Sequence, residues 1–238
     1  MNWTTRRRFW TTVAPVPSED GWTVVLDARP LRTPAKAPLI LPSAPLAEAI
    51  AAEWDSQREE IRPQDMPLTR AANSAIDKVR PARAAVVTML AEYGGSDLLC
   101  YRADGPEGLV ARQCERWDRW IGWAEAELSA PLTLVQGVMH CEQPEASLSR
   151  LQDAVAAHDA FELAALHDLV TLSGSLVLGL AVSRGVLDPQ EAWRLSRLDE
   201  DWQAELWGED AEAARAAAER EAAFLSAKMF LDLVRATD

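Results

Sequence analysis

The chain has 238 residues, and its 37 acidic side chains outnumber its 24 basic ones, which gives a formal net charge of -13. A protein of this charge repels phosphate backbones and anionic lipid, so binding to nucleic acid or to a membrane surface is not expected. Hydrophobic residues make up 48% of the sequence, as in ordinary globular proteins. The length is sufficient for one large or two modest domains.

Cysteine usage and the N-terminus bear on the compartment. Cys100, Cys114 and Cys141 are far apart and odd in number, and no C-x-x-C occurs, so neither a disulfide framework nor a structural zinc site is indicated. A reducing compartment fits this pattern. Arg6-Arg7-Arg8 has no apolar run behind it, so the sequence predicts no secretory signal and a cytoplasmic location.

The first 42 residues have the pattern of extended structure. Phe9–Val16, Trp22–Asp27 and Leu39–Leu41 are rich in β-branched and aromatic residues and are bounded by proline or by Asp-Gly. Between the second and third of these lies Asp27-Ala28-Arg29-Pro30, a predicted turn in which Arg29 is pushed away from helical angles by the proline that follows. A small antiparallel sheet is predicted.

A helix is predicted to follow this sheet. Ser43 with a proline close behind is a plausible start, and the helix should end before Pro63. Leu46, Ile50 and Trp54 are spaced by four and form an inward face, so Trp54 is predicted to be structural. Laid across the sheet, this helix would complete a two-layer α+β unit.

The remainder of the chain is predicted to be mostly helical. The apolar stretch Thr171–Ser183 is too short to span a bilayer and is typical of a buried central helix, with Gly174, Ser175 and Gly179 allowing close helix approach. The predicted fold class is therefore α+β. A small N-terminal antiparallel sheet with a packed helix forms a domain over residues 1–76, and a larger, all-helical orthogonal bundle forms a domain over residues 77–238. The predicted later helices cover 144–158, 160–184, 189–207 and 209 to near the C-terminus.

Within the predicted helix over residues 189–207, two faces separate at about 100° per residue. An apolar stripe of the kind that packs inward comprises Leu195, Leu198, Trp202 and Leu206. The nearly opposite stripe is polar and comprises Ser196, Asp199, Glu200, Gln203 and Trp207. Charges on a helix face are normally solvated, but a tryptophan among them is unexpected and is favoured at binding hot spots.

Signatures of catalysis and metal binding are missing from the sequence. The three histidines do not have metal-ligand spacing, because His158 and His167 would lie on opposite sides of a continuous helix. Neither nucleotide-binding loops nor hydrolase motifs occur. Asp199 and Glu200 are the most suggestive carboxylate pair, but adjacent helical residues diverge too far to ligate one metal. The sequence therefore predicts no enzyme, no metal and no cofactor.

A set of motifs runs in order along nearly the whole chain. These motifs are Arg7-Arg8-Phe9-Trp10, Gly21–Pro34, Ala52-Glu53-Trp54-Asp55-Ser56-Gln57, Met66–Arg70, Cys100-Tyr101-Arg102, Glu115-Arg116-Trp117-Asp118, and Leu195–Glu200 with Gln203 and Trp207-Gly208. Taken together, they resemble a known family, the assembly chaperones of the F-type ATP synthase catalytic sector that act on its alpha subunit (the mitochondrial ATP synthase assembly factor 2 type).

This resemblance implies a non-enzymatic chaperone that shields the unassembled alpha subunit and prevents its aggregation until it meets the beta subunit. The family's functionally sensitive acidic position is carried over to Asp199 or Glu200, and the partner-binding set is completed by Ser196, Gln203 and Trp207. Structural family positions are Trp54, Trp22, Arg29 and Pro30. One departure is Ala28, where the family has glycine, so the turn type there is in question.

The implied partner is the alpha subunit, with no nucleic acid and no membrane insertion. The implied site of action is the bacterial cytoplasm, and family counterparts work in the mitochondrial matrix. Two alternatives stay open at this point. A helical scaffold or adaptor subunit bound permanently to a complex would share the aromatic excess, but would co-purify stoichiometrically with the mature assembly. A helical enzyme of unrecognised type would need a deep cleft holding a group with a strained pKa.

Overall fold

The structure is a computed structural model that describes residues 7–237. Residues 1–6 of the predicted first domain, which include Arg6, lie outside the described residues. The chain forms two compact units, each built from separate stretches. The first unit combines the described part of Met1–Arg83 with Ala160–Ala165 and the described part of Met229–Asp238. The second comprises Ala84–Asp159 and Leu166–Lys228. The sequence predicts one continuous stretch for each domain, with the boundary between residues 76 and 77.

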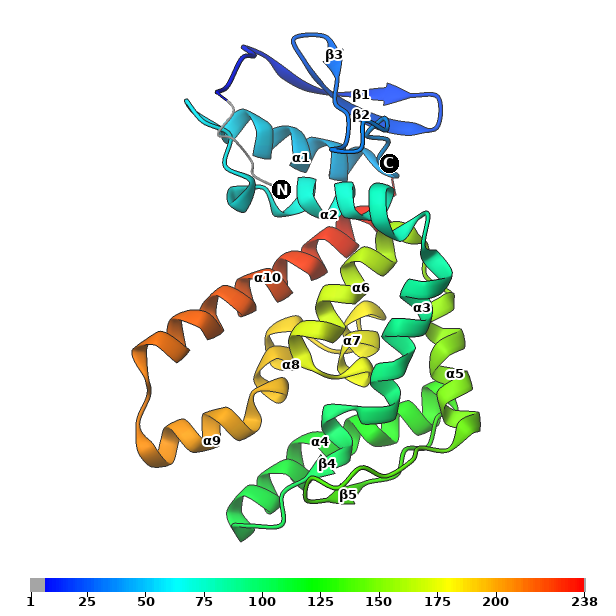
Figure 1. The fold of residues 1–238 in the computed structure, drawn as a ribbon, viewed down its shortest axis with the longest axis vertical. Coiled ribbons are helices and arrows are strands. Elements are labelled where there is room, and N and C mark those ends of the chain that lie inside the picture. Colours follow the sequence, from blue (N-terminus) through cyan, green and yellow to red (C-terminus); the bar gives the residue numbers. More distant parts are fainter. Residues whose placement is uncertain (1–6, 238) are drawn as a thin grey trace. The chain divides into compact units, whose positions relative to one another are not determined.

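The first unit is an antiparallel sheet covered by helices, which gives the chain the α+β class predicted from sequence. The strands lie in the order β1-β2-β3, and their bounds are β1 Val13–Ser18, β2 Gly21–Leu26 and β3 Arg29–Pro30. Helix α1, Ala44–Ser56, lies along one face of the strands (Figure 1) and turns its apolar residues toward them. The core between the two layers is fully buried and includes Val24, Leu41, Leu46 and Ile50.

A carboxylate joins the first two helices of this unit. Helix α1 starts where predicted, because the Ser43 side chain accepts from the backbone N–H of Leu46. Helix α2, Pro67–Ser74, begins against Glu53 of α1, whose carboxylate accepts from the backbone N–H groups of Leu68 (2.7 Å) and Thr69 (2.8 Å). These donors are first-turn groups that have no partner inside their own helix. Glu53 therefore fixes the start of α2 on α1.

The turn between β2 and β3 is left-handed at Ala28, the position where the family has glycine and where the sequence left the turn type open. Asp27 and Ala28 both have positive φ, at 46° and 66°. The Asp27 carboxylate accepts from the backbone N–H groups of Thr11 and Thr12, and these hydrogen bonds lower the pKa of Asp27 to about 2. Asp27 is thus fixed by neighbours in the chain segment before β1, whereas Ala28 holds its left-handed conformation against the steric cost of its Cβ.

We expect Ala28→Gly to raise the free energy of unfolding by about 1 kcal/mol, because glycine adopts positive φ without the clash of a Cβ. Urea unfolding followed by circular dichroism measures this change. Ala213→Gly is the matched control, because Ala213 lies exposed in the helix Ala211–Arg235 and its replacement should destabilise by a similar amount. If Ala28→Gly lowered the free energy of unfolding as much as Ala213→Gly does, the left-handed conformation of Ala28 would have no steric cost and the prediction would be wrong.

The second unit is helical except for a short parallel pairing of β4 (Tyr101–Arg102) with β5 (Val135–Gln136). Helix α7 lies in the middle of the helices of this unit (Figure 1), and all eight of its residues are buried. Its helices are α3 Arg83–Glu92, α4 Glu107–Leu128, α5 Glu145–Ala156, α6 Ala160–Ser173, α7 Leu176–Ser183, α8 Pro189–Ser196, α9 Leu198–Trp207 and α10 Ala211–Arg235. The residues of α3, α6 and α10 are divided between the two units.

The prediction of one helix over residues 160–184 was wrong. The chain breaks between α6 and α7 at Gly174, which has a φ of 70°, and Ser175 then caps α7 by accepting from the backbone N–H of Leu178. Glycine in this conformation is a common helix terminator. The prediction that small residues allow close helix approach is confirmed at Gly179, where an added Cβ would lie 2.6 Å from Cγ2 of Val170 on α6.

Gly179→Ala is expected to lower the free energy of unfolding by about 2 kcal/mol, because the added methyl overpacks the contact between α6 and α7. The clashing atom belongs to a β-branched side chain in a helix, which has one strongly preferred χ1 rotamer, so moving it away has an energetic cost. Gly122→Ala is the control, since nothing lies within 4 Å of a Cβ at Gly122 of α4, and there the better helix former should stabilise. Thermal unfolding of both variants measures the difference.

Candidate functional site

The predicted site lies on α8 and α9, which are separate helices. The helix expected over residues 189–207 is interrupted at Arg197, whose φ of -109° and ψ of 11° are not helical. Helix α8 begins at Pro189, capped by the Asp188 side chain. Because the break changes the helix phase, the two stripes drawn on one continuous helix do not extend across it.

Two residues do not lie where the two stripes place them. Ser196, assigned to the polar stripe, is 9% exposed, and its hydroxyl donates to the backbone carbonyl of Trp193 at 2.8 Å. Leu206, assigned to the apolar stripe, is 56% exposed. Leu195 and Leu198 are buried, as the apolar stripe predicts. Ser196 is therefore the buried last residue of α8 and bonds within its own helix, so its assignment to the exposed polar face was wrong.

Asp199 is held by the interior of the second unit. The Gln113 side chain of α4 donates from Nε2 to Oδ1 of Asp199 at 2.7 Å, while its Oε1 accepts from the backbone N–H of Ala103 at 2.8 Å. Gln113 is 1% exposed and Asp199 is half-buried. A buried amide must satisfy both its donor and its acceptor atoms. Asp199 therefore fixes the first turn of α9 to α4.

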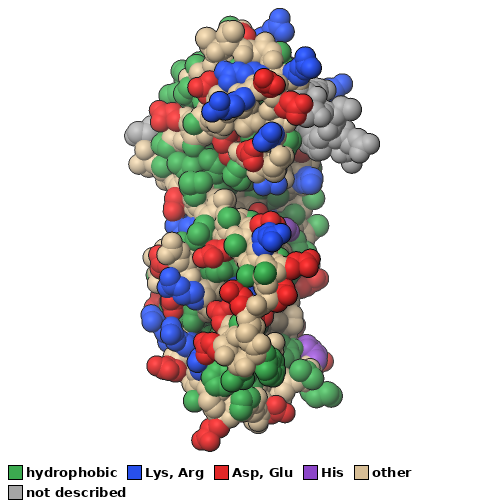
Figure 2. Space-filling view, turned by 90° about the vertical axis from the view of Figure 1, so that its left-hand side faces the viewer, with side chains coloured by type: hydrophobic (Ala, Val, Ile, Leu, Met, Phe, Trp, Pro, Cys, Tyr) green, Lys and Arg blue, Asp and Glu red, His purple; other side chains and the backbone are tan. Residues whose placement is uncertain are grey.

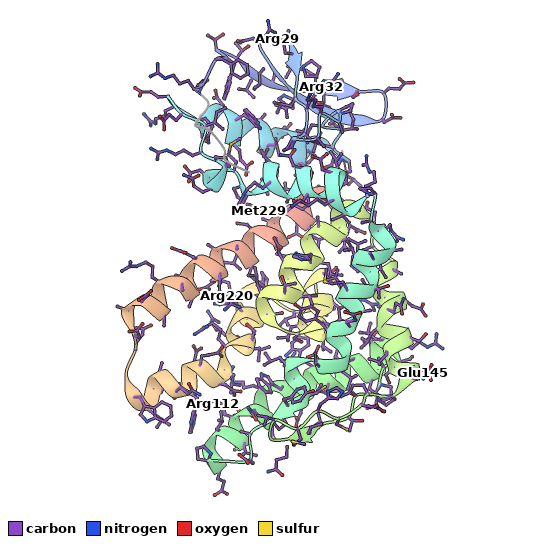
Figure 3. All side chains as sticks on the ribbon, viewed as in Figure 1. Arg29, Arg32, Arg112, Glu145, Arg220 and Met229 are labelled. Atoms are coloured by element: carbon purple, nitrogen blue, oxygen red, sulfur yellow. The ribbon has the colours of Figure 1, made fainter. Side chains whose placement is uncertain are left out.

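Arg112 holds the last turns of α9. Its guanidinium donates two hydrogen bonds to the carboxylate of Glu205, at 2.8 and 2.9 Å. The Cζ atom of the same guanidinium lies 4.6 Å from the centre of the Trp202 ring. Figure 3 labels Arg112 where α4 faces α9. On α4, an added Cβ at Gly108 would lie 2.8 Å from the tip of that ring, so only glycine leaves it room. Bidentate pairing and stacking on an aromatic face both use the planar guanidinium.

The outward side of α9 has a different character. Glu200 and Gln203 are exposed, and so are the apolar residues Leu206 and Trp207, the latter with 78% of its surface accessible. We call these four residues the α9 surface. At the level of α9, Figure 2 shows hydrophobic side chains gathered among acidic ones. Exposed tryptophan beside leucine is uncommon on a free surface and is typical of an interaction site.

A cavity of about 380 Å³ lies between α4, α8 and α9. Its walls are mostly charged, and its arginines are paired, Arg112 with Glu205, and Arg116 and Arg194 with Glu191. Burial raises the pKa of Asp201, and the nearby carboxylate of Glu205 adds to this effect, while Arg197 lowers it. These charges compensate each other across the walls, which is the pattern of helix attachment rather than of a catalytic cleft.

Among residues 7–237, no group of three His, Cys, Asp or Glu side chains is placed to hold a metal ion, and no helix is long and apolar enough to cross a membrane. His158 is buried, and its Nε2 lies 2.8 Å from the hydroxyl of Ser183. His167 lies on α6, whereas His158 follows the end of α5, so no continuous helix joins the two histidines.

The predicted structural positions lie in the first unit. Trp54 of α1 packs edge-on against Trp10 with ring centres 5.2 Å apart, and Trp22 is half-buried in β2. Arg29 and Pro30 form β3 and are exposed, and Figure 3 labels Arg29 on the outer side of the strands. These two residues do not contribute to the core.

Sequence reasoning missed the two α4 residues that position α9, Arg112 and Gln113. For Gln113 a signal existed, because it has the helical spacing of the buried residues Trp117, Trp120 and Ala124. A glutamine on an apolar stripe needs a buried partner, although the sequence does not say which one. For Arg112 no such signal existed, because basic side chains on an exposed helix face are common.

Comparison with known proteins identifies the family. A family model described as ATP12 chaperone protein matches residues 7–125, half of the chain. The chain belongs to the ATP12 chaperone family. The family is a group of non-enzymatic assembly chaperones of the F1 ATP synthase, so the alternative of an unrecognised enzyme is closed.

Solved structures of related proteins cover nearly all of the chain. Atp12 from Paracoccus denitrificans is 54% identical, with a TM-score of 0.94 over 98% of this chain and 100% of that one. An aspartate-to-lysine mutant of the same protein matches equally, over 99% of this chain. The Atu1473 protein from Agrobacterium tumefaciens is 42% identical, with a TM-score of 0.93 over 97% of this chain and 87% of that one.

A more distant relative comes from a eukaryote. Protein atp12, mitochondrial, from Schizosaccharomyces pombe is 26% identical over 214 residues, which cover 85% of this chain and 74% of the relative. The likeness thus extends beyond the residues that the ATP12 family model matches and includes most of the second unit.

Proposed function

We propose that this ATP12-family chaperone binds the unassembled alpha subunit of the F1 ATP synthase, covers the surface through which that subunit meets beta, and prevents its aggregation. The observation that carries the proposal is the exposure of Trp207 beside acidic residues, on a helix whose other side is fixed to α4 by Arg112 and Gln113. A rigid helix that presents a large apolar side chain binds with little loss of conformational entropy.

The charge on α9 supports a basic or amide-bearing contact on the client. Helix α9 contains Asp199, Glu200, Asp201 and Glu205 and no basic residue. Asp199 and Glu205 are engaged by α4, while Glu200 is exposed and has no side-chain partner among the interactions of the described residues. We therefore assign client contact to the α9 surface and a positioning role to Asp199.

The test is co-expression of the alpha subunit alone, with and without this chain, followed by measurement of soluble alpha. The proposal requires that alpha becomes soluble and elutes with the chaperone. If alpha stays insoluble and nothing co-elutes, the proposal is wrong about the client. Beta subunit expressed alone is the specificity control, and it should gain no solubility from this chain.

Glu200→Lys is expected to reduce co-elution of alpha at least tenfold, because it places a positive charge where the client is expected to present a basic or amide group. Its melting temperature should stay within a few degrees of wild type, since an exposed side chain without partners contributes little to stability. Glu219→Lys on α10, also exposed, is the matched control for the change in net charge. A melting temperature lowered by many degrees would show that Glu200 is structural.

A permanently bound scaffold or adaptor remains the competing proposal. A chaperone is released from the mature enzyme, whereas a scaffold stays at a fixed ratio, so quantifying this chain in purified ATP synthase separates the two. We also propose that the protein acts in the bacterial cytoplasm, which its 54% identity with a Paracoccus protein and its three free cysteines support.

A further inference from the structure

A second cavity, of about 430 Å³, lies on the second unit at the C-terminal half of α4 and the turn that follows α7. This volume is within the range of sites for small ligands and single side chains. The residues of α9 take no part in it. We call it the Arg–Trp cavity, and its walls are Arg119, Trp120, Trp123, Glu127, Arg184 and Val186.

Two indoles and two guanidinium groups dominate its walls. The rings of Trp120 and Trp123 meet edge to face with their centres 6.4 Å apart. The guanidinium of Arg119 lies 4.6 Å from the centre of the Trp120 ring, and that of Arg184 lies 5.9 Å from the centre of the Trp123 ring. An arginine stacked on an aromatic ring keeps its N–H groups at the ring edge free for a planar anion.

Neither arginine forms an ion pair with another residue of the part of the chain that the structure describes. The cavity beside α9 differs in this respect, because Arg112, Arg116 and Arg194 all have carboxylate partners there. The one carboxylate of the Arg–Trp cavity, Glu127, lies beyond ion-pair distance of both guanidinium groups and leaves an excess positive charge. In a chain with a net charge of -13, a cavity lined by two arginines without ion-pair partners has the opposite charge to the protein as a whole.

We propose that the Arg–Trp cavity binds an acidic peptide segment, in which a side-chain carboxylate lies next to an aliphatic or aromatic residue. The carboxylate pairs with Arg119 and Arg184, and the apolar side chain packs on the Trp123 ring and on Val186, which is 53% exposed. This site goes beyond the client contact proposed for α9, because it has the opposite charge and does not depend on the identity of that client.

The charge of the whole chain decides between a peptide and larger polyanions. Nucleic acid and anionic membranes carry dense negative charge, which a protein of net charge -13 repels. A peptide with one or two carboxylates brings little charge beyond what the two arginines neutralise. The indole faces also match an apolar side chain, which a phosphate backbone does not offer.

The test uses a fluorescently labelled, blocked hexapeptide of alternating glutamate and leucine, titrated with the full-length protein and followed by anisotropy. A matched hexapeptide has glutamine in place of each glutamate. We expect the acidic peptide to bind wild-type protein at least tenfold more tightly than the glutamine peptide. We expect the double variant Arg119→Gln with Arg184→Gln to lose this preference, while its circular dichroism spectrum stays unchanged.

Arg150→Gln with Arg215→Gln is the control, because both arginines are exposed in the second unit and the double change alters net charge by the same amount. It should bind the acidic peptide as wild type does. The proposal is overturned if the control weakens binding equally, or if wild type shows no preference for the acidic peptide. It is also overturned if acetate or phosphate displaces the peptide at concentrations equal to that of the peptide, or if vesicles of phosphatidylglycerol bind wild type but not the Arg119/Arg184 variant.

Discussion

Replacing Asp97 by alanine is expected to lower the free energy of unfolding by about 4 kcal/mol. Asp97 lies before the short helical turn that leads into β4, and it is completely buried. Its carboxylate accepts from the hydroxyl of Ser175 at 2.8 Å and from the backbone N–H groups of Val177 (2.9 Å) and Leu99 (3.0 Å). Alanine would leave all three donors buried and without an acceptor.

The position of these donors explains the size of the effect. Ser175 and Val177 form the start of α7, the helix whose eight residues are all buried, so water cannot replace the missing acceptor. Burial raises the pKa of Asp97, and the three hydrogen bonds act against that shift. Asp97→Asn should cost about half as much as alanine, because its carbonyl oxygen still accepts while its amino group faces other donors.

Urea unfolding measures both variants, with the midpoint shifting and the slope unchanged if the fold is otherwise intact. Asp104→Ala is the control, since Asp104 is exposed and shows no hydrogen bond or ion pair among the described interactions. Its unfolding midpoint should match that of wild type. A small effect of Asp97→Ala would mean that the start of α7 rearranges to satisfy its own donors, and the argument from burial would then fail.

The second large effect concerns Trp207. Trp207→Ala is expected to weaken binding of the alpha subunit by about 3 kcal/mol, on the order of a hundredfold, because a tryptophan that becomes buried in an interface is a typical hot spot. The stability of the isolated chaperone should change little, since the ring is 78% exposed at the last residue of α9 and Gly208 ends that helix.

Pull-down of alpha by tagged wild-type and variant chaperone, at several chaperone concentrations, gives the change in affinity. Phe9→Ala is the matched control, because Phe9 is another strongly exposed aromatic residue, at 65%, and belongs to the first unit rather than to α9. If both substitutions weaken binding equally, the client contact is not confined to α9. If neither does, the exposed tryptophan has another role.

Local patterns predicted much of the fold. The first two strands, the start of α1 at Ser43 and the burial of α7 follow from alternation, capping chemistry and a run of apolar residues, all of which are local in sequence. The predicted third strand was wrong, because Leu39–Leu41 makes only an isolated bridge from Leu41 to Trp22 and β3 lies at Arg29–Pro30, within the predicted turn. The breaks at Gly174 and Arg197 were missed, because the apolar pattern continues through both. At Arg197 no glycine or proline marks the end of α8, so the sequence offers no stop signal.

The candidate site was predictable only in part, for a related reason. The exposed side of α9 follows from residues within three turns of one another, and Glu200, Gln203 and Trp207 are indeed exposed. What fixes α9 comes from far along the chain. Asp199 and Gln113 are 86 residues apart, and Arg112 and Glu205 are 93 apart. One sequence contains no information on which distant side chains meet, so Asp199 appeared free when it is anchored.

The composition of the first unit has a consequence for synthesis on the ribosome. The hydroxyl of Ser43, at the start of α1, donates to the carbonyl of Leu233, and the Phe161 ring stacks on Phe230. Leu233 and Phe230 are translated after the whole of the second unit. Translation therefore produces the N-terminal strands long before their unit can close, and closure waits until residues 229–237 have left the exit tunnel. A nascent chain arrested before residue 229 should keep its N-terminal third accessible to protease.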